Sequence, residues 1–151
     1  MSIPLVATIL ASCANQPASE LAVVRPWARP VSAGASLAVL YFEMTSDIPD
    51  TLVAVQVSPE IADAVQLHAS MGDSSGSTGH SHGAPGGSSV SDKPFVISPD
   101  RALVLEPGGM HAMLVGVNRD LSVGESFTAK FVLASGRKIT ADFAVAVNRP
   151  K

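Results

Sequence analysis

The stretch Leu105-Glu-Pro-Gly-Gly-Met-His-Ala-Met113 decides how this chain is expected to fold. Its proline and two glycines are turn residues, so a turn should separate a short apolar run at 102–105 from a longer one at 111–117. Side chains two apart on a strand project from the same face. We therefore expect His111 and Met113 to lie side by side on one face of a β-sheet.

The same strand-and-turn pattern continues along the chain after residue 20. Runs rich in β-branched and aromatic residues alternate with turn signals, and no sustained helical period occurs. The predicted strands are 21–25, 35–43, 51–57, 64–68, 95–97, 102–105, 111–117, 126–133 and 138–147. Short strands at this spacing predict an all-β fold, a sandwich or small barrel.

Three local features give detailed expectations. The first strand should end at Pro26, because proline cannot donate a ladder hydrogen bond. Residues 58–63 have the composition of one helical turn. The alternation in 51–57 predicts Leu52, Ala54 and Gln56 on one face and Val53, Val55 and Val57 on the other.

Composition limits the class of protein. The chain has 151 residues, of which 46% are hydrophobic and 15% are charged, which suits one folded domain and argues against disorder. We assign this domain to residues 20–150. The net charge of −3 and the absence of a Lys/Arg cluster argue against a nucleic-acid partner. No apolar run approaches the length of a membrane-spanning helix.

Cys13, the only cysteine, closes the apolar run 5–13. The sequence Leu10-Ala-Ser-Cys13 resembles the lipobox of bacterial lipoproteins, in which the cysteine is lipidated and becomes the mature N-terminus. We interpret residues 1–19 as a signal and lipobox remnant with a short tether, which predicts an extracytoplasmic, lipid-anchored protein. Residues 1–12 lack the basic residues of a signal peptide. The alternative is an ordinary first strand with a buried thiol.

Imidazole and thioether donors gather in one part of the sequence. The four histidines are His68, His80, His82 and His111. His68 ends a predicted strand. Met71 follows three residues later, so strand alternation would place it on the opposite face, and it can reach the same site only if the chain turns after His68. Together with Met113 these donors suit copper, above all Cu(I), better than magnesium or calcium. Met44 and Met110 are interpreted as packing residues.

Residues 72–91 are rich in glycine and serine and contain His80 and His82. This composition cannot form a packed core, so we predict a long flexible loop. Its imidazoles favour Cu(II), Ni(II) or Zn(II) more than thioethers do. The loop is expected either to fold over the His/Met site or to capture Cu(II) separately. Neutral drift of a low-complexity segment is the alternative.

Several segments resemble the PCu(A)C family of periplasmic copper chaperones. They are Trp27-Ala-Arg29, Tyr41, Val65-Gln-Leu-His68, Leu105–Leu114 and Leu121-Ser-Val-Gly-Glu125, and the resemblance covers roughly residues 21–147. It implies a cupredoxin-like β-barrel that binds Cu(I) through two histidines and two methionines. It also implies delivery of copper towards the binuclear centre of cytochrome c oxidase.

By position, His68, His111 and Met113 match three ligands of that family. The position of the family's second methionine falls near Ser89, inside the Gly/Ser-rich loop. Met71 is the remaining methionine that could supply a fourth donor, and His80 and His82 are loop candidates.

The sequence therefore predicts an extracytoplasmic copper chaperone that passes Cu(I) to a copper-accepting protein, such as an assembly factor or subunit of cytochrome c oxidase. No nucleophile elbow or phosphate-binding loop is present, so no enzyme activity is predicted. An electron-transfer cupredoxin would need a cysteine thiolate in the site. The same sequence is also compatible with a scaffold or adhesion lipoprotein without metal, or with a protein that scavenges Cu(II) or zinc through its histidine loop.

Overall fold

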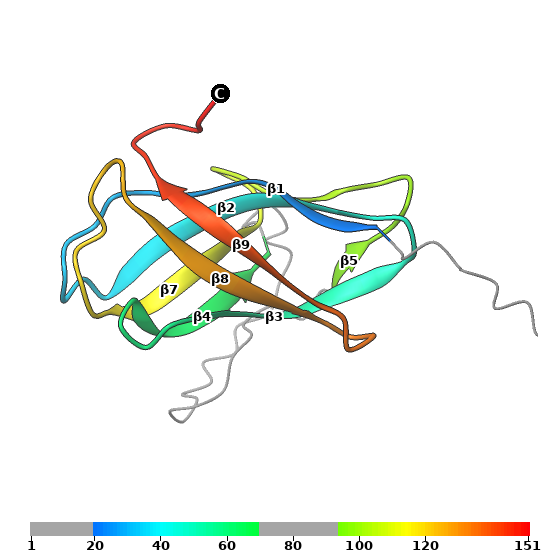
Figure 1. The fold of residues 1–151 in the computed structure, drawn as a ribbon, viewed down its shortest axis with the longest axis horizontal. Coiled ribbons are helices and arrows are strands. Elements are labelled where there is room, and N and C mark those ends of the chain that lie inside the picture. The colour runs from blue at the N-terminus through cyan, green and yellow to red at the C-terminus, as the bar shows by residue number, and fades with distance from the viewer. Residues whose placement is uncertain (1–19, 70–93) are drawn as a thin grey trace, which may run out of the picture.

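The computed structural model describes residues 20–69 and 94–151, which form nine strands of one sheet (Figure 1). The strands are β1 (Leu21–Ala28), β2 (Leu37–Ser46), β3 (Asp50–Val57), β4 (Ala62–His68), β5 (Phe95–Ile97), β6 (Leu103–Leu105), β7 (His111–Val117), β8 (Ser126–Leu133) and β9 (Lys138–Val145). Among the described residues no helix is long and apolar enough to cross a membrane. The predictions for 1–19 and for the loop at 72–91 concern residues outside the described ranges.

The strands follow the order β4-β7-β2-β1-β9-β8-β3-β5, and β6 pairs with β2. Neighbours are antiparallel except β1 and β9, which run parallel. The sheet curls so that β8 and β9 cross in front of β2, β7 and β4 (Figure 1). β3 and β4 are consecutive in the chain but lie near opposite ends of this order and do not pair with each other. The barrel is therefore only half closed. The all-β prediction is confirmed.

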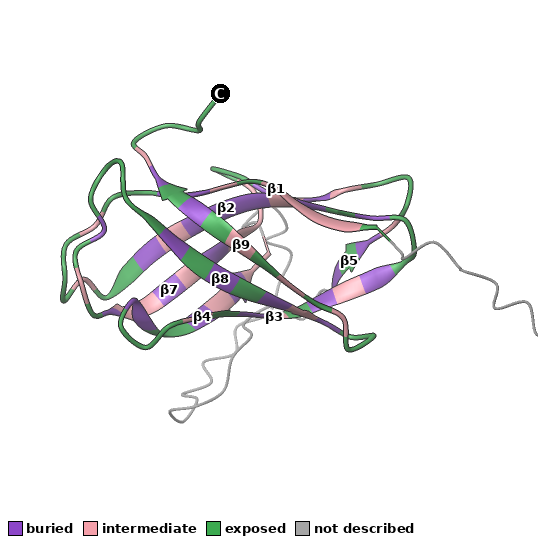
Figure 2. Ribbon diagram, viewed as in Figure 1, coloured by how far each residue is buried: buried purple, intermediate pink, exposed green. Residues whose placement is uncertain are grey.

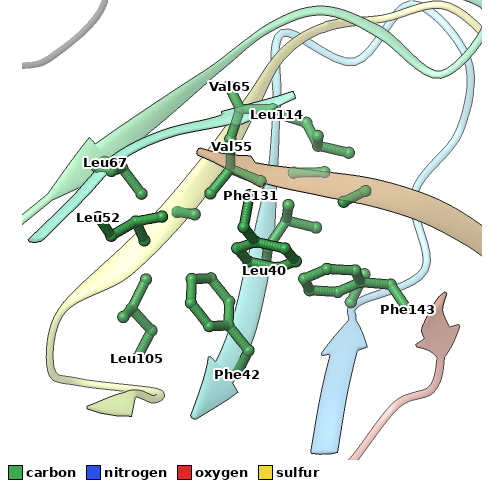
Figure 3. Packing of buried hydrophobic residues seen from close by; sticks show 14 of the residues in the cluster. Leu40, Phe42, Leu52, Val55, Val65, Leu67, Leu105, Leu114, Phe131 and Phe143 are labelled. Atoms are coloured by element: carbon green, nitrogen blue, oxygen red, sulfur yellow. The ribbon is translucent and has the colours of Figure 1, made fainter. Parts of the chain in front are cut away.

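The strands carry the buried residues shown in purple in Figure 2, and aromatic side chains pack together in the core that they form (Figure 3). Phe42 of β2 contacts Phe131 of β8 edge to face, with ring centroids 5.0 Å apart and planes inclined by 74°. Phe143 of β9 lies parallel to Phe131 at 6.1 Å. Met44 is fully buried in the same core, and Met110 packs against it, as predicted. Phenylalanine rings dominate the packing of a small domain because each ring buries a large apolar area.

β1 does not end at Pro26, and that prediction is wrong. The strand continues to Ala28, and its register against β2 shifts between Val24 and Trp27. Arg25 sits in this bulge with φ +49°. A bulge leaves an extra residue out of the hydrogen-bond ladder, so a proline without an N–H is tolerated there.

β3 also departs from simple alternation. Leu52 and Val55 are buried while Val53 is exposed, because the register against β8 shifts between Leu52 and Ala54. The predicted division into two faces holds for Ala54–Val57 and is wrong for Leu52 and Val53, which the shift moves to the opposite faces. The expected helical turn is a single hydrogen-bonded turn, in which the amides of Ile61 and Ala62 both donate to the carbonyl of Ser58.

Asp50, at the start of β3, anchors the β8–β9 hairpin. Its carboxylate accepts hydrogen bonds from the Ser135 hydroxyl at 2.5 Å, the Thr51 amide at 2.8 Å and Arg137 Nη2 at 2.9 Å. Burial by itself raises the pKa of Asp50, but these donors outweigh it and lower the pKa to about 2. This network closes the end of the sheet where β3 and the hairpin meet.

Candidate metal site

The two histidines of the described sheet face each other across neighbouring strands. β4 and β7 are antiparallel, and their register sets His68 directly opposite His111. The two imidazole rings stack with centroids 5.3 Å apart and planes inclined by only 5°. Two residues distant in sequence thus present their ring nitrogens at one place.

Met113 joins this pair from the same strand as His111. Ala112 between them is fully buried on the inner face, so His111 and Met113 project from the outer face, as alternation predicts. In the register of the sheet, Met113 lies opposite Gln66 of β4 and Val39 of β2. The outer face of β4 and β7 therefore carries two imidazoles and a thioether together.

The Pro-Gly-Gly turn fixes the tautomer of His111. Its Nδ1 lies 3.0 Å from the carbonyl oxygen of Gly109. A carbonyl only accepts hydrogen bonds, so Nδ1 carries the proton and Nε2 keeps its lone pair for a metal. Gly108 adopts φ +82°, a conformation that glycine enters without strain and that lets the turn present this carbonyl.

His68 carries an unsatisfied nitrogen. Its Nε2 is buried and has no hydrogen-bond partner among the described residues. Burial lowers the pKa of His68, and the electrostatic influence of the neighbouring His111 lowers that pKa further. The imidazole is therefore neutral at neutral pH, which is the form that binds metals. A buried nitrogen without a partner is costly, and a metal ion would satisfy it.

A pocket of about 280 Å³ opens beside His111. Val39, Tyr41, Gly108, Gly109 and His111 line it. The Tyr41 ring packs on Trp27, with centroids 4.7 Å apart. The β2 side of the site is therefore a packed apolar and aromatic wall, whereas the opposite side is the edge strand β4.

Three of the predicted ligands, His68, His111 and Met113, lie among the described residues. Met71, His80, His82 and the proposed lipidation site Cys13 all lie outside the described residues. Within residues 20–69 and 94–151, no three His, Cys, Asp or Glu side chains cluster as a metal site. Thioether sulfur from Met113 is thus the third donor that the described sheet offers to the histidine pair.

One residue at this place was not selected from the sequence. Gln66 is half-buried, lies on the same face as His68 and stands opposite Met113. The sequence feature that could have identified Gln66 is its spacing of two residues from His68, the same alternation that places His111 and Met113 on one face.

Solved structures with the same fold include PCuAC domains, one of them copper-bound, and a Cu(I) protein. The apo PCuAC domain from PmoF1 is 22% identical, with TM-score 0.64 over 85% of this chain and 94% of that one. The copper-bound PCuAC domain from PmoF2 is 22% identical, with TM-score 0.63 over 85% and 93%. CuI-DR1885 from Deinococcus radiodurans is 27% identical, with TM-score 0.54 over 83% and 79%. The predicted cupredoxin-like PCuAC fold is confirmed.

Residues 21–145 match the family described as "Putative lipoprotein LpqE-like", and the chain belongs to this LpqE-like family. The Rickettsia prowazekii protein described as "Uncharacterized protein RP573" is 26% identical over 130 residues. That match covers 84% of this chain and 67% of the relative. The family and the structural neighbours together confirm the resemblance to PCu(A)C proteins.

Proposed function

We propose that this protein is a copper chaperone that binds Cu(I) through His68, His111 and Met113. The observation that carries the proposal is the cross-strand pairing of the two histidines on the face that holds the methionine. Neutral imidazole and thioether donors suit Cu(I). Among the structural neighbours, DR1885 was solved with Cu(I) and the PmoF2 domain with copper, which supports copper as the cargo.

The arrangement suits transfer rather than permanent storage. Both imidazoles are half-buried, and His68 lies on the edge strand β4. The pocket beside His111 leaves room for a ligand from an acceptor protein to approach. Copper can then leave by stepwise ligand exchange, while the Gly109 carbonyl keeps the His111 ring oriented. The proposed role is binding and transfer, without catalysis.

The acceptor and the location follow from the resemblance and the family. We propose delivery to a copper-accepting protein of cytochrome c oxidase assembly, from the extracytoplasmic side of a membrane. The lipoprotein description of the family supports a lipid anchor at Cys13. Mass spectrometry of the membrane fraction tests the anchor: an unmodified peptide running through Cys13 in the mature protein would contradict it.

The loop residues stay predictions. Met71 is a proposed additional donor, and His80 and His82 are proposed either to cover the site or to take Cu(II). Removal of residues 73–90 tests the loop. Unchanged stoichiometry and unchanged affinity for both copper states would rule out its role.

An anaerobic Cu(I) competition titration tests the proposed function. We expect tight one-to-one binding by the intact chain and its loss in the double variant His111→Ala/Met113→Ala. The matched control is Val115→Ala, which shortens the next outward side chain of the same strand and removes no donor. Copper binding that the double variant leaves unchanged would refute the proposal, and the fluorescence of Trp27 verifies that each variant is folded.

A further inference from the structure

We propose that the amide oxygen of Gln66 is the fourth ligand of copper at this site, which completes a set of two nitrogens, one sulfur and one oxygen. The inference rests on the proposed function and deepens it, because it assigns to Gln66 the fourth position for which Met71 is the alternative donor. It follows from the pairing of β4 with β7 and uses only residues that the structure describes.

Two neighbouring rows of the sheet define the site. His68 faces His111 in one row, and Gln66 faces Met113 in the next. Leu67 and Ala112, which separate the rows, are buried on the inner face, so all four side chains project outward.

The spacing of these rows suits one metal ion. Opposite residues of an antiparallel pair have Cβ atoms about 5 Å apart, and residues two apart along a strand are separated by about 7 Å. The four side chains thus stand at the corners of a small rectangle. An ion above its centre lies within reach of each of them.

The surroundings of the rectangle favour Gln66 over other donors. The following row pairs Ala64 with Val115, and β2 places Val39 beside Met113. None of these three side chains has a donor atom. Tyr41 does carry an oxygen, but its ring is buried against Trp27. Gln66 is half-buried on the edge strand, and the register sets it opposite Met113.

The chemistry of the amide has a consequence for the copper site. A glutamine oxygen is a known replacement for methionine as a weak axial ligand of copper. Because oxygen is a harder donor than sulfur, this ligand favours Cu(II) relative to a site with two thioethers. Gln66 is also uncharged, so it completes the coordination without the strong attraction of a carboxylate. The site should therefore accept both copper states and still release the ion.

Copper binding by the variants Gln66→Ala and Gln66→Met tests the inference. We expect Gln66→Ala to weaken Cu(II) binding by at least about tenfold, a change that the loss of even an outer-shell partner can cause. Its Cu(II) paramagnetic resonance spectrum should also change. X-ray absorption of the Cu(I) form should show one sulfur ligand in the natural chain and two in Gln66→Met. Gln56→Ala, an exposed glutamine of β3, is the matched control and should behave as the natural chain.

The possible failures are distinguishable. Two sulfur ligands in the natural chain, or a Gln66→Ala variant with unchanged affinity and spectrum, would overturn the role of Gln66. If His111→Ala/Met113→Ala still abolished binding in that case, the proposed function would stand. Copper binding unaffected by both sets of variants would refute the function and the inference together.

Discussion

Asp50→Asn should destabilise the protein at neutral pH and much less in acid. Asp50 is 8% exposed, and its carboxylate joins β3 to the β8–β9 hairpin through Ser135 and Arg137. The pKa of Asp50 is about 2, against an ordinary value of 3.8. At about 1.36 kcal/mol per unit, this difference corresponds to about 2.4 kcal/mol of folding free energy.

The pH window follows from the direction of the shift. The folded state holds the proton of Asp50 more weakly than the unfolded state does, so this contribution is fully present above the unfolded pKa near 3.8. It is lost as the pH falls towards the folded pKa of about 2. The difference in stability between the natural chain and Asp50→Asn should therefore be about 2–3 kcal/mol at pH 7 and close to zero near pH 2.

Urea unfolding followed by tryptophan fluorescence measures this difference. Trp27 is the only tryptophan, is 3% exposed and packs on Tyr41, so its emission reports unfolding. Asp100→Asn, in an exposed turn, is the control and should leave stability unchanged. A loss under about 0.5 kcal/mol at pH 7, within the range of ordinary surface changes, would refute the reasoning. A loss of the same size at pH 7 and pH 2 would also refute it.

Two further predictions concern the paired strands β4 and β7. In the metal-free protein, burial and then the neighbouring His111 keep the pKa of His68 below 6.5, so its imidazole NMR signals should titrate below that pH. The folded state binds this proton more weakly than the unfolded state does, so the metal-free protein should lose stability as the pH falls through 6.5. An NMR titration midpoint of His68 at or above 6.5 would contradict the effect of burial and of His111 on its pKa. Gly116→Ala should lower the unfolding free energy by about 1–3 kcal/mol, because φ is +66° and a Cβ would lie 2.3 Å from Asp63 Oδ2. Gly124→Ala, with φ +92° and open space around it, is the control, and an equal loss in urea unfolding would refute the steric argument.

Local pattern predicted much of this fold. The strands at 95–97, 111–117 and 126–133 have the bounds that their sequences predicted. The errors at Pro26 and along 51–57 have one cause. A bulge depends on how a strand pairs with its neighbour, as β1 does with β2 and β3 with β8, and a single strand's sequence does not contain that partner.

The sequence by itself determined that His111 and Met113 share a face, because alternation is a property of the pleated backbone of one strand. Only the tertiary structure decided that His68 stands opposite His111 and that Gln66 stands opposite Met113. Register between β4 and β7 is set by burial of their inner residues, since a shift of one position would turn every core side chain to the solvent. The geometry of the site is thus a consequence of how the opposite face of the sheet packs.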